Sequence, residues 1–109
     1  MSNMMKVGMV AASFGMICAV AAAQSKPAAR EITVGNFTFA PADLKVSVGA
    51  TVTWTNRDDI PHTVVSTDKA FKSRVMDTDQ KFSFTFTQPG TYEYFCSIHP
   101  KMTGKVIVR

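Results

Sequence analysis

The sequence predicts an all-β fold, an antiparallel Greek-key β-sandwich of about seven or eight strands. Short runs of alternating apolar and polar residues recur along the chain, and Gly, Pro and Asn separate them. After the first 23 residues, no segment has the 3.6-residue apolar period of an amphipathic helix. The chain has 109 residues, of which 46% are hydrophobic, so it can bury the modest core of one small domain.

The first half of this domain contains three runs with a period of two. In the first run, Gly35–Asn36 interrupts the alternation, and we expect a β-bulge there before Phe37 and Phe39 resume the period. The third run places Val52 and Trp54 on one face and threonines on the other. The expected strands are residues 31–39, 44–48 and 51–56.

The second half has a β-branched run that begins at His62, followed by a phenylalanine ladder in which Phe82, Phe84 and Phe86 alternate with Ser and Thr. We expect Trp54 and this ladder to supply most of the core. Tyr92 follows Pro89–Gly90 and resembles the tyrosine corner of Greek-key sandwiches, whose hydroxyl bonds to upstream backbone. The expected strands are residues 62–67, 81–87, 91–96 and 104–109.

The N-terminus has the pattern of a secretory signal peptide over residues 1–23. Lys6 precedes an uncharged, Ala-rich stretch that ends at Ala21–Ala23, which predicts cleavage near Ala23. The alternative is a retained membrane anchor, but the stretch is short and composed mostly of small residues, whereas a spanning helix needs about 20 strongly apolar ones. We expect an exported protein without a membrane span after processing, with a flexible segment at 24–30 and the domain at 31–109.

Composition excludes several classes of function. The net charge is +4 and its basic residues are scattered, which argues against a nucleic-acid partner. The glycine-rich motifs that hold dinucleotides or phosphates are absent from the sequence. Cleavage would remove Cys18 and leave Cys96 as an unpaired thiol in an oxidising compartment, where it would be either buried and inert or bound to a metal.

Four residues form a candidate metal site. Cys96, His99 and Met102 follow one another at steps of three, from the end of an expected strand into a loop. His62 begins another strand, and strand ends from different hairpins converge at one pole of a sandwich. A thiolate and two imidazoles with a weak axial thioether suit copper in an electron-transfer site, whereas structural zinc more often uses additional cysteines. The remaining methionine of the domain, Met76, is interpreted as packing.

These motifs resemble those of the cupredoxins, the blue-copper family. The resemblance covers nearly all of residues 31–109, and its specific parts are Asp58–His62 and Tyr92–Val106. The two-residue gap between His99 and Met102 is similar to that of the amicyanins. The resemblance implies a Greek-key sandwich with one type 1 copper per chain, and a monomer in the periplasm that shuttles single electrons. Its partners would be redox proteins, such as a periplasmic dehydrogenase as donor and a c-type cytochrome as acceptor.

The sequence departs from the family pattern at Thr63, where family members commonly have Asn. The Asn side chain ties the two ligand loops together, and a hydroxyl is too short to make the same amide contacts. The backbone N–H of Thr63 can still reach the Cys96 sulfur. We therefore expect loop rigidity and reduction potential to be atypical for the family.

Three functions compete for this site. A non-enzymatic electron carrier is the leading interpretation, with His99 as the electron port between Ile98 and Pro100, and Phe95 as a rival contact. The alternative is a periplasmic copper storage or delivery protein, for which Met- or His-rich tracts are expected and are not found after residue 23. A cysteine hydrolase using Cys96 and His99 would also need an orienting group and a cleft.

Overall fold

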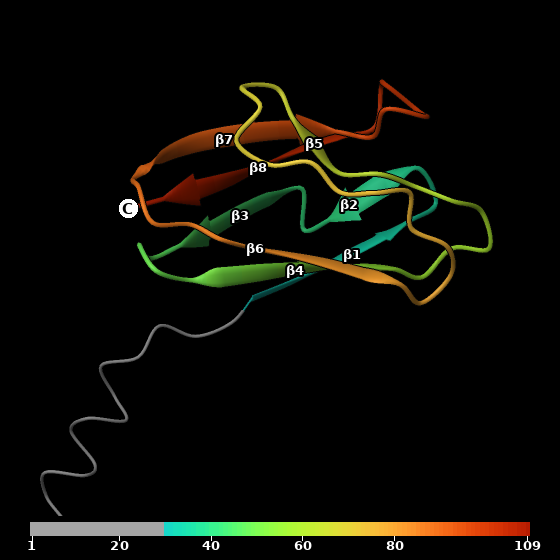
Figure 1. Cartoon of the computed structure of the whole chain (residues 1–109), viewed down its shortest axis with the longest axis horizontal. Helices are drawn as coiled ribbons and strands as arrows, with labels where there is room; N and C mark the ends of the chain where they lie inside the picture. Colours follow the sequence, from blue (N-terminus) through green and yellow to red (C-terminus); the bar gives the residue numbers. More distant parts are fainter. Residues whose placement is uncertain (1–29) are drawn as a thin grey trace, which may run out of the picture.

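Eight strands form within residues 30–109, the part of the chain that this computed structural model describes (Figure 1). The predicted signal peptide, 1–23, lies outside the described residues, as does the segment 24–30 apart from Arg30. Among the described residues no helix is long and apolar enough to cross a membrane. The strands are β1 (Arg30–Gly35), β2 (Thr38–Ala40), β3 (Asp43–Val46), β4 (Thr51–Asn56), β5 (Val65–Ser66), β6 (Lys81–Thr85), β7 (Gly90–Phe95) and β8 (Thr103–Val108).

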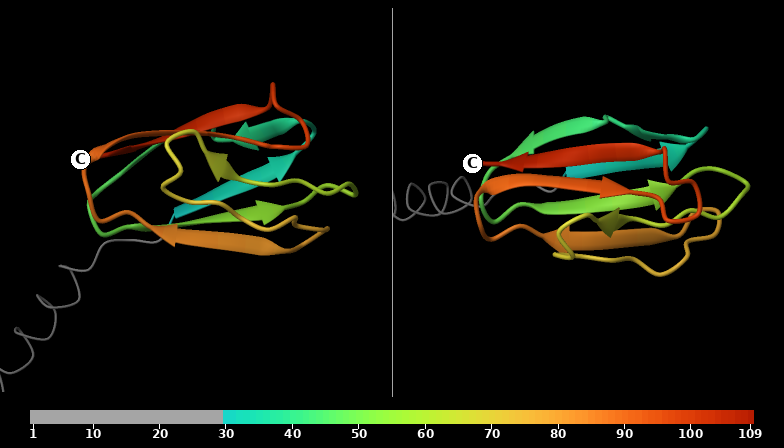
Figure 2. Two further views of the ribbon diagram at one scale, coloured as in Figure 1. Left: turned by 45° about the horizontal axis from the view of Figure 1, so that its top comes forward. Right: turned by 90° about the horizontal axis from the view of Figure 1, so that it is seen from above.

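The strands make two four-stranded sheets that face each other, which confirms the predicted β-sandwich (Figures 1 and 2). One sheet has the order β2-β1-β4-β6 and the other the order β3-β8-β7-β5. The sheets are mixed rather than antiparallel throughout, because β1 pairs with β4 and β3 pairs with β8 in parallel. Parallel neighbours need a crossover connection. Here the chain contributes β3 to the opposite sheet before it returns to form β4 beside β1.

The expected bulge at Gly35–Asn36 is a hairpin turn. Asn36 and Phe37 have φ angles of 52° and 57°, and β2 folds back antiparallel to β1. Two central residues with positive φ give the turn whose twist matches a tight hairpin. The expectation that Phe37 resumes the strand alternation is therefore wrong: Phe37 is 56% exposed at the turn, whereas Phe39 is 2% exposed in β2.

The expected strand at 62–67 is mostly irregular, and only Val65–Ser66 forms β5. It belongs to the long connection between β4 and β6, which is held by backbone bonds to its own second half. His62 and Met76 exchange two such bonds, with N–O distances of 3.1 and 2.8 Å, and Ser73 N donates to Val64 O at 2.8 Å. The expected strand at 31–39 is divided by the turn into β1 and β2, and the one at 51–56 coincides with β4. The remaining expected strands differ from the observed ones by one or two residues at their ends.

Trp54 lies at the centre of the core and is fully buried. Its ring is 5.4 Å from that of Tyr94 on β7, so it joins the two sheets directly. It is also 5.5 Å from the ring of Phe71, which lies in the connection between β4 and β6. Of the phenylalanine ladder, Phe86 is fully buried while its two neighbours pack at the border of the core. Phe71, which belongs to none of the expected strands, contacts all three ladder residues.

The C-terminal hairpin β7–β8 carries two tyrosines with different roles. Tyr92 donates its hydroxyl to Gln88 O at 2.9 Å, which confirms the predicted tyrosine corner. Tyr94 is buried and pairs across the ladder with Gly104. A Cβ at position 104 would lie 2.5 Å from the Tyr94 hydroxyl oxygen, so glycine is required for the strands to pair around this ring.

We expect Gly104→Ala to destabilise the metal-free protein by about 1–3 kcal/mol, because the buried Tyr94 ring must shift to accept the methyl group. Gly35→Ala is the matched control, since its Cβ would meet nothing closer than 3.7 Å. Urea unfolding of both variants measures the difference. Equal stability of the two variants would contradict the proposed role of Gly104.

Candidate metal centre

Cys96 directly follows β7, and a short loop connects it to β8. Three backbone hydrogen bonds close this loop: His99 N donates to Cys96 O at 3.2 Å, Met102 N to His99 O at 2.9 Å, and Cys96 N to Met102 O at 3.1 Å. Each bond joins two of the three predicted ligand residues that this loop carries. The C-x2-H-x2-M spacing therefore sets the geometry of the loop as well as its donor set.

His62 is positioned by the end of β4 and by Met76. Asn56 is fully buried, and its side-chain amide donates to Ile60 O at 3.0 Å and to Met76 O at 2.9 Å. The Asn56 side-chain oxygen accepts from Asp58 N at 2.9 Å. Together with the two backbone bonds between His62 and Met76, these contacts fix the segment that leads to His62 without any metal.

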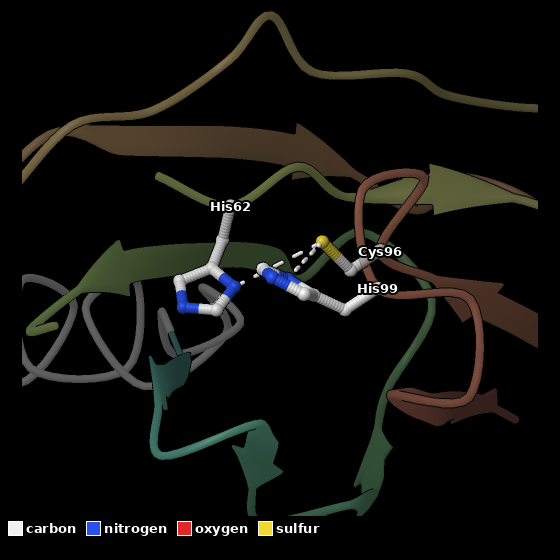
Figure 3. A group of neighbouring side chains, drawn as sticks. All are labelled: His62, Cys96 and His99. Carbon is white, nitrogen blue, oxygen red and sulfur yellow. Dashed lines mark hydrogen bonds between the residues drawn. The ribbon is translucent and has the colours of Figure 1, made fainter. Parts of the chain in front are cut away.

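The imidazoles of His62 and His99 converge on the Cys96 sulfur, as Figure 3 shows. The Cys96 Sγ is 3.8 Å from Nδ1 of His62 and 3.6 Å from Nδ1 of His99. One ligand atom from each residue lies within 4.8 Å of the others. His62 and Cys96 are fully buried and His99 is partly exposed, so the group faces solvent on the His99 side.

Met102, the predicted axial ligand, is also in this region. It is 3% exposed, and its backbone is bonded to both Cys96 and His99. Its role as a ligand stays a prediction. Met76, interpreted from the sequence as packing, is fully buried in the core.

Neighbouring donors favour ionisation of the Cys96 thiol. Burial raises its pKa. The hydrogen bond from Thr63 N at 3.4 Å and those from the side chains of His62, Thr63 and His99 outweigh burial and lower the pKa to about 6. The thiolate is the form that binds metals. A single thiolate beside two imidazoles is a donor set that suits copper.

Thr63 joins the two loops that carry the candidate ligands. Its hydroxyl oxygen accepts from Ser97 N at 2.7 Å and lies 2.8 Å from Ser97 Oγ. The same hydroxyl is 3.7 Å from the Cys96 sulfur. The sequence led us to expect that a hydroxyl here cannot make the contacts of an amide. The hydroxyl contact with Ser97 nevertheless links the two loops.

Two residues near the site were not assigned a role from the sequence. Asp58 Oδ2 lies 3.0 Å from His62 Nε2, and its position four residues before the histidine was the available signal. The Phe37 ring meets His99 edge-on at 5.0 Å and His62 at 6.4 Å. Phe37 was missed because its placement follows from the unexpected turn. It lines a shallow apolar hollow with His99 and the loop residues Pro100, Lys101 and Met102.

Comparisons with known proteins agree with this arrangement. A family model described as a cupredoxin-like domain matches residues 7–108. Amicyanin of Paracoccus denitrificans is 41% identical over 93 residues, covering 81% of this chain and 71% of amicyanin. Amicyanin-alpha of Methylorubrum extorquens is 34% identical over 96 residues, covering 83% of this chain and 81% of that one. The solved structure of a novel purple cupredoxin from Nitrosopumilus maritimus aligns with a TM-score of 0.71 and 34% identity, covering 73% of this chain and 99% of that one.

We expect the stability of the metal-free protein to decrease as the pH falls from 9 towards 6. The Cys96 pKa is lowered from 9.0 to about 6 on folding, so the stabilisation is complete above the unfolded value and is lost as the pH falls through the folded value. Urea unfolding over a pH series measures this slope, and thiolate absorbance of the folded protein gives the midpoint. Cys96→Ser should remove this contribution to the slope. A slope unchanged by that substitution would contradict the assignment.

Thr63→Val should destabilise the metal-free protein by about 1–3 kcal/mol, because Ser97 N loses its acceptor while Val keeps the shape of Thr. Amide hydrogen exchange at Ser97 should become faster. Thr53→Val is the matched control, since it removes an exposed hydroxyl contact with Ser83 at 2.7 Å, and we expect a change within about 0.5 kcal/mol. If the two variants matched in stability and in Ser97 exchange, Thr63 would not link the loops.

Proposed function

Because the chain belongs to the cupredoxin-like family, we propose that it is a periplasmic blue-copper electron carrier. The observation that carries the proposal is the convergence of one cysteine sulfur and two histidine nitrogens, all within 4.8 Å of one another. We propose His62, Cys96, His99 and Met102 as the ligands of one type 1 copper per chain. Copper supplies a reversible one-electron change between Cu(I) and Cu(II) when bound.

The protein's part is to hold the donors and to keep water away from most of them. His62 and Cys96 are fully buried, and the loop bonds restrain His99 and Met102. Soft sulfur suits the reduced state and imidazole tolerates the oxidised one, so the same donors serve both. With Met102 as a fourth donor, the site would have no open position for a substrate, which suits a carrier that is not an enzyme.

His99 is the proposed electron port, because it is the partly exposed member of the buried group. Two large exposed apolar side chains lie beside His99: Phe37, which is 56% exposed, and its neighbour in the loop, Ile98, which is 45% exposed. A small apolar surface around an imidazole edge favours brief encounters with a redox partner. The rival contact, Phe95, is partly buried at the end of β7 and pairs with Val65.

The leader supports the proposed location. A basic start, an apolar stretch and Ala21–Ala23 are typical of a secretory signal peptide, and similarity to amicyanins fits export to the periplasm. We propose that the mature chain works as a monomer between redox proteins, with a dehydrogenase as donor and a c-type cytochrome as acceptor. No nucleic acid is expected among its partners.

Copper loading and electron self-exchange test the function. The copper-loaded protein should be intensely blue, and Cys96→Ser should lose the colour because a hydroxyl is a poor ligand for soft metals. Ile98→Lys should slow self-exchange by about tenfold or more, because two copies then meet with like charges at the port. Phe95→Lys is the matched control and should change the rate little.

Three results would refute parts of this proposal. A Cys96→Ser variant as blue as the parent would exclude the copper–thiolate site. If Phe95→Lys slowed self-exchange and Ile98→Lys did not, the port would lie on the flank of the sandwich. A protein that binds copper but releases it readily to a chelator, with negligible self-exchange, would be a storage or delivery protein instead.

A further inference from the structure

The two ring nitrogens of His62 face different groups. Nδ1 lies 3.8 Å from the Cys96 sulfur, whereas Nε2 lies 3.0 Å from Asp58 Oδ2. The His62 side chain is 0% exposed and that of Asp58 is 18% exposed, so this contact is largely shielded from water. It is also the contact that holds the ring on the side away from the cluster.

The Asp58 carboxylate is itself restrained. Its Oδ2 also accepts from Asn36 N at 3.0 Å, and its Oδ1 accepts from Asp59 N at 2.9 Å. The neighbouring cation, Arg57, pairs with Asp79 at 2.8 Å, so it is directed to another partner. The acceptor that His62 meets is thus fixed by the backbone of the β1–β2 turn and of its own segment.

In its other contacts the Asp58 carboxylate is an acceptor, because Oδ2 receives the hydrogen of Asn36 N and Oδ1 that of Asp59 N. A carboxylate accepts hydrogen bonds and donates none. The hydrogen in the contact with Asp58 therefore belongs to His62 Nε2. Nδ1 is the nitrogen that faces Cys96, and it can bind a metal that displaces its own hydrogen.

We propose that Asp58 is a positioning residue of the metal centre, which directs Nδ1 of His62 towards Cys96 and favours the oxidised state of a bound copper. The inference rests on the proposed function of the site. A carboxylate behind a ligand histidine makes the ring a stronger donor and sets its orientation. Its negative charge stabilises the more positive copper state, and the buried ring between them transmits the effect with little screening by solvent.

Asp58→Asn tests the charge, because Asn has nearly the same shape and keeps one acceptor oxygen. Its control is Asp59→Asn, which removes the same charge at the next residue. The Asp59 side chain is exposed and has no hydrogen bond to His62 in the described structure. The reduction potential of the copper-loaded protein should rise for Asp58→Asn. We expect a change of about tenfold in the preference for Cu(II) over Cu(I), or about 59 mV, and a clearly smaller change in the control.

Nitrogen-15 NMR of the metal-free parent tests the geometry without copper or substitution. His62 Nε2 should show the shift of a nitrogen that bears hydrogen, and Asp58→Ala should shift that signal more than Asp59→Ala does. A hydrogen-free Nε2 in the parent would overturn the proposal, as would equal potential shifts in the two Asn variants. Failure of the parent to turn blue with copper would refute the proposed function instead, while the NMR result would still decide the role of Asp58.

Discussion

The hydrogen bonds that Thr63 makes with Cys96 and Ser97 hold together two loops that are distant in sequence and belong to different connections. Thr63 N and its hydroxyl surround the Cys96 sulfur, at 3.4 and 3.7 Å, and the hydroxyl also accepts from Ser97 N at 2.7 Å. The low pKa of Cys96 and the approach of His62 to the sulfur both depend on this junction. Another direct link between these two segments is the short pairing of β5 with β7, Val65 with Phe95 and Ser66 with Tyr94.

Core residues fix the positions of the two strands that lead to this junction. Trp54 links β4 to Phe71 and Tyr94, and Tyr94 stands two residues before Cys96 on β7. The same strand β4 ends in Asn56, whose buried amide holds the connection that carries His62. The segments that carry His62 and Cys96 are therefore both anchored in one aromatic cluster.

Alternation and spacing were sufficient to predict the sandwich, the tyrosine corner and the convergence of His62, Cys96 and His99. They were insufficient where a local pattern allowed two backbone paths. Gly35–Asn36 fits a bulge or a turn, and the turn requires positive φ at Phe37, a conformation that bulky residues rarely adopt. Phe71 and Asp58 escaped prediction because they lie in an irregular segment, where contacts depend on tertiary structure and not on a period.

The preformed cluster has a consequence for the speed of the proposed reaction. Electron transfer is slowed by every nuclear movement that must accompany the change in charge, so a low reorganisation energy is an advantage. Here the sulfur and both nitrogens lie together within 4.8 Å, and backbone bonds, a threonine and a buried asparagine hold the segments that carry them. Most of the ordering is completed when the chain folds, which leaves little to rearrange each time an electron arrives or departs.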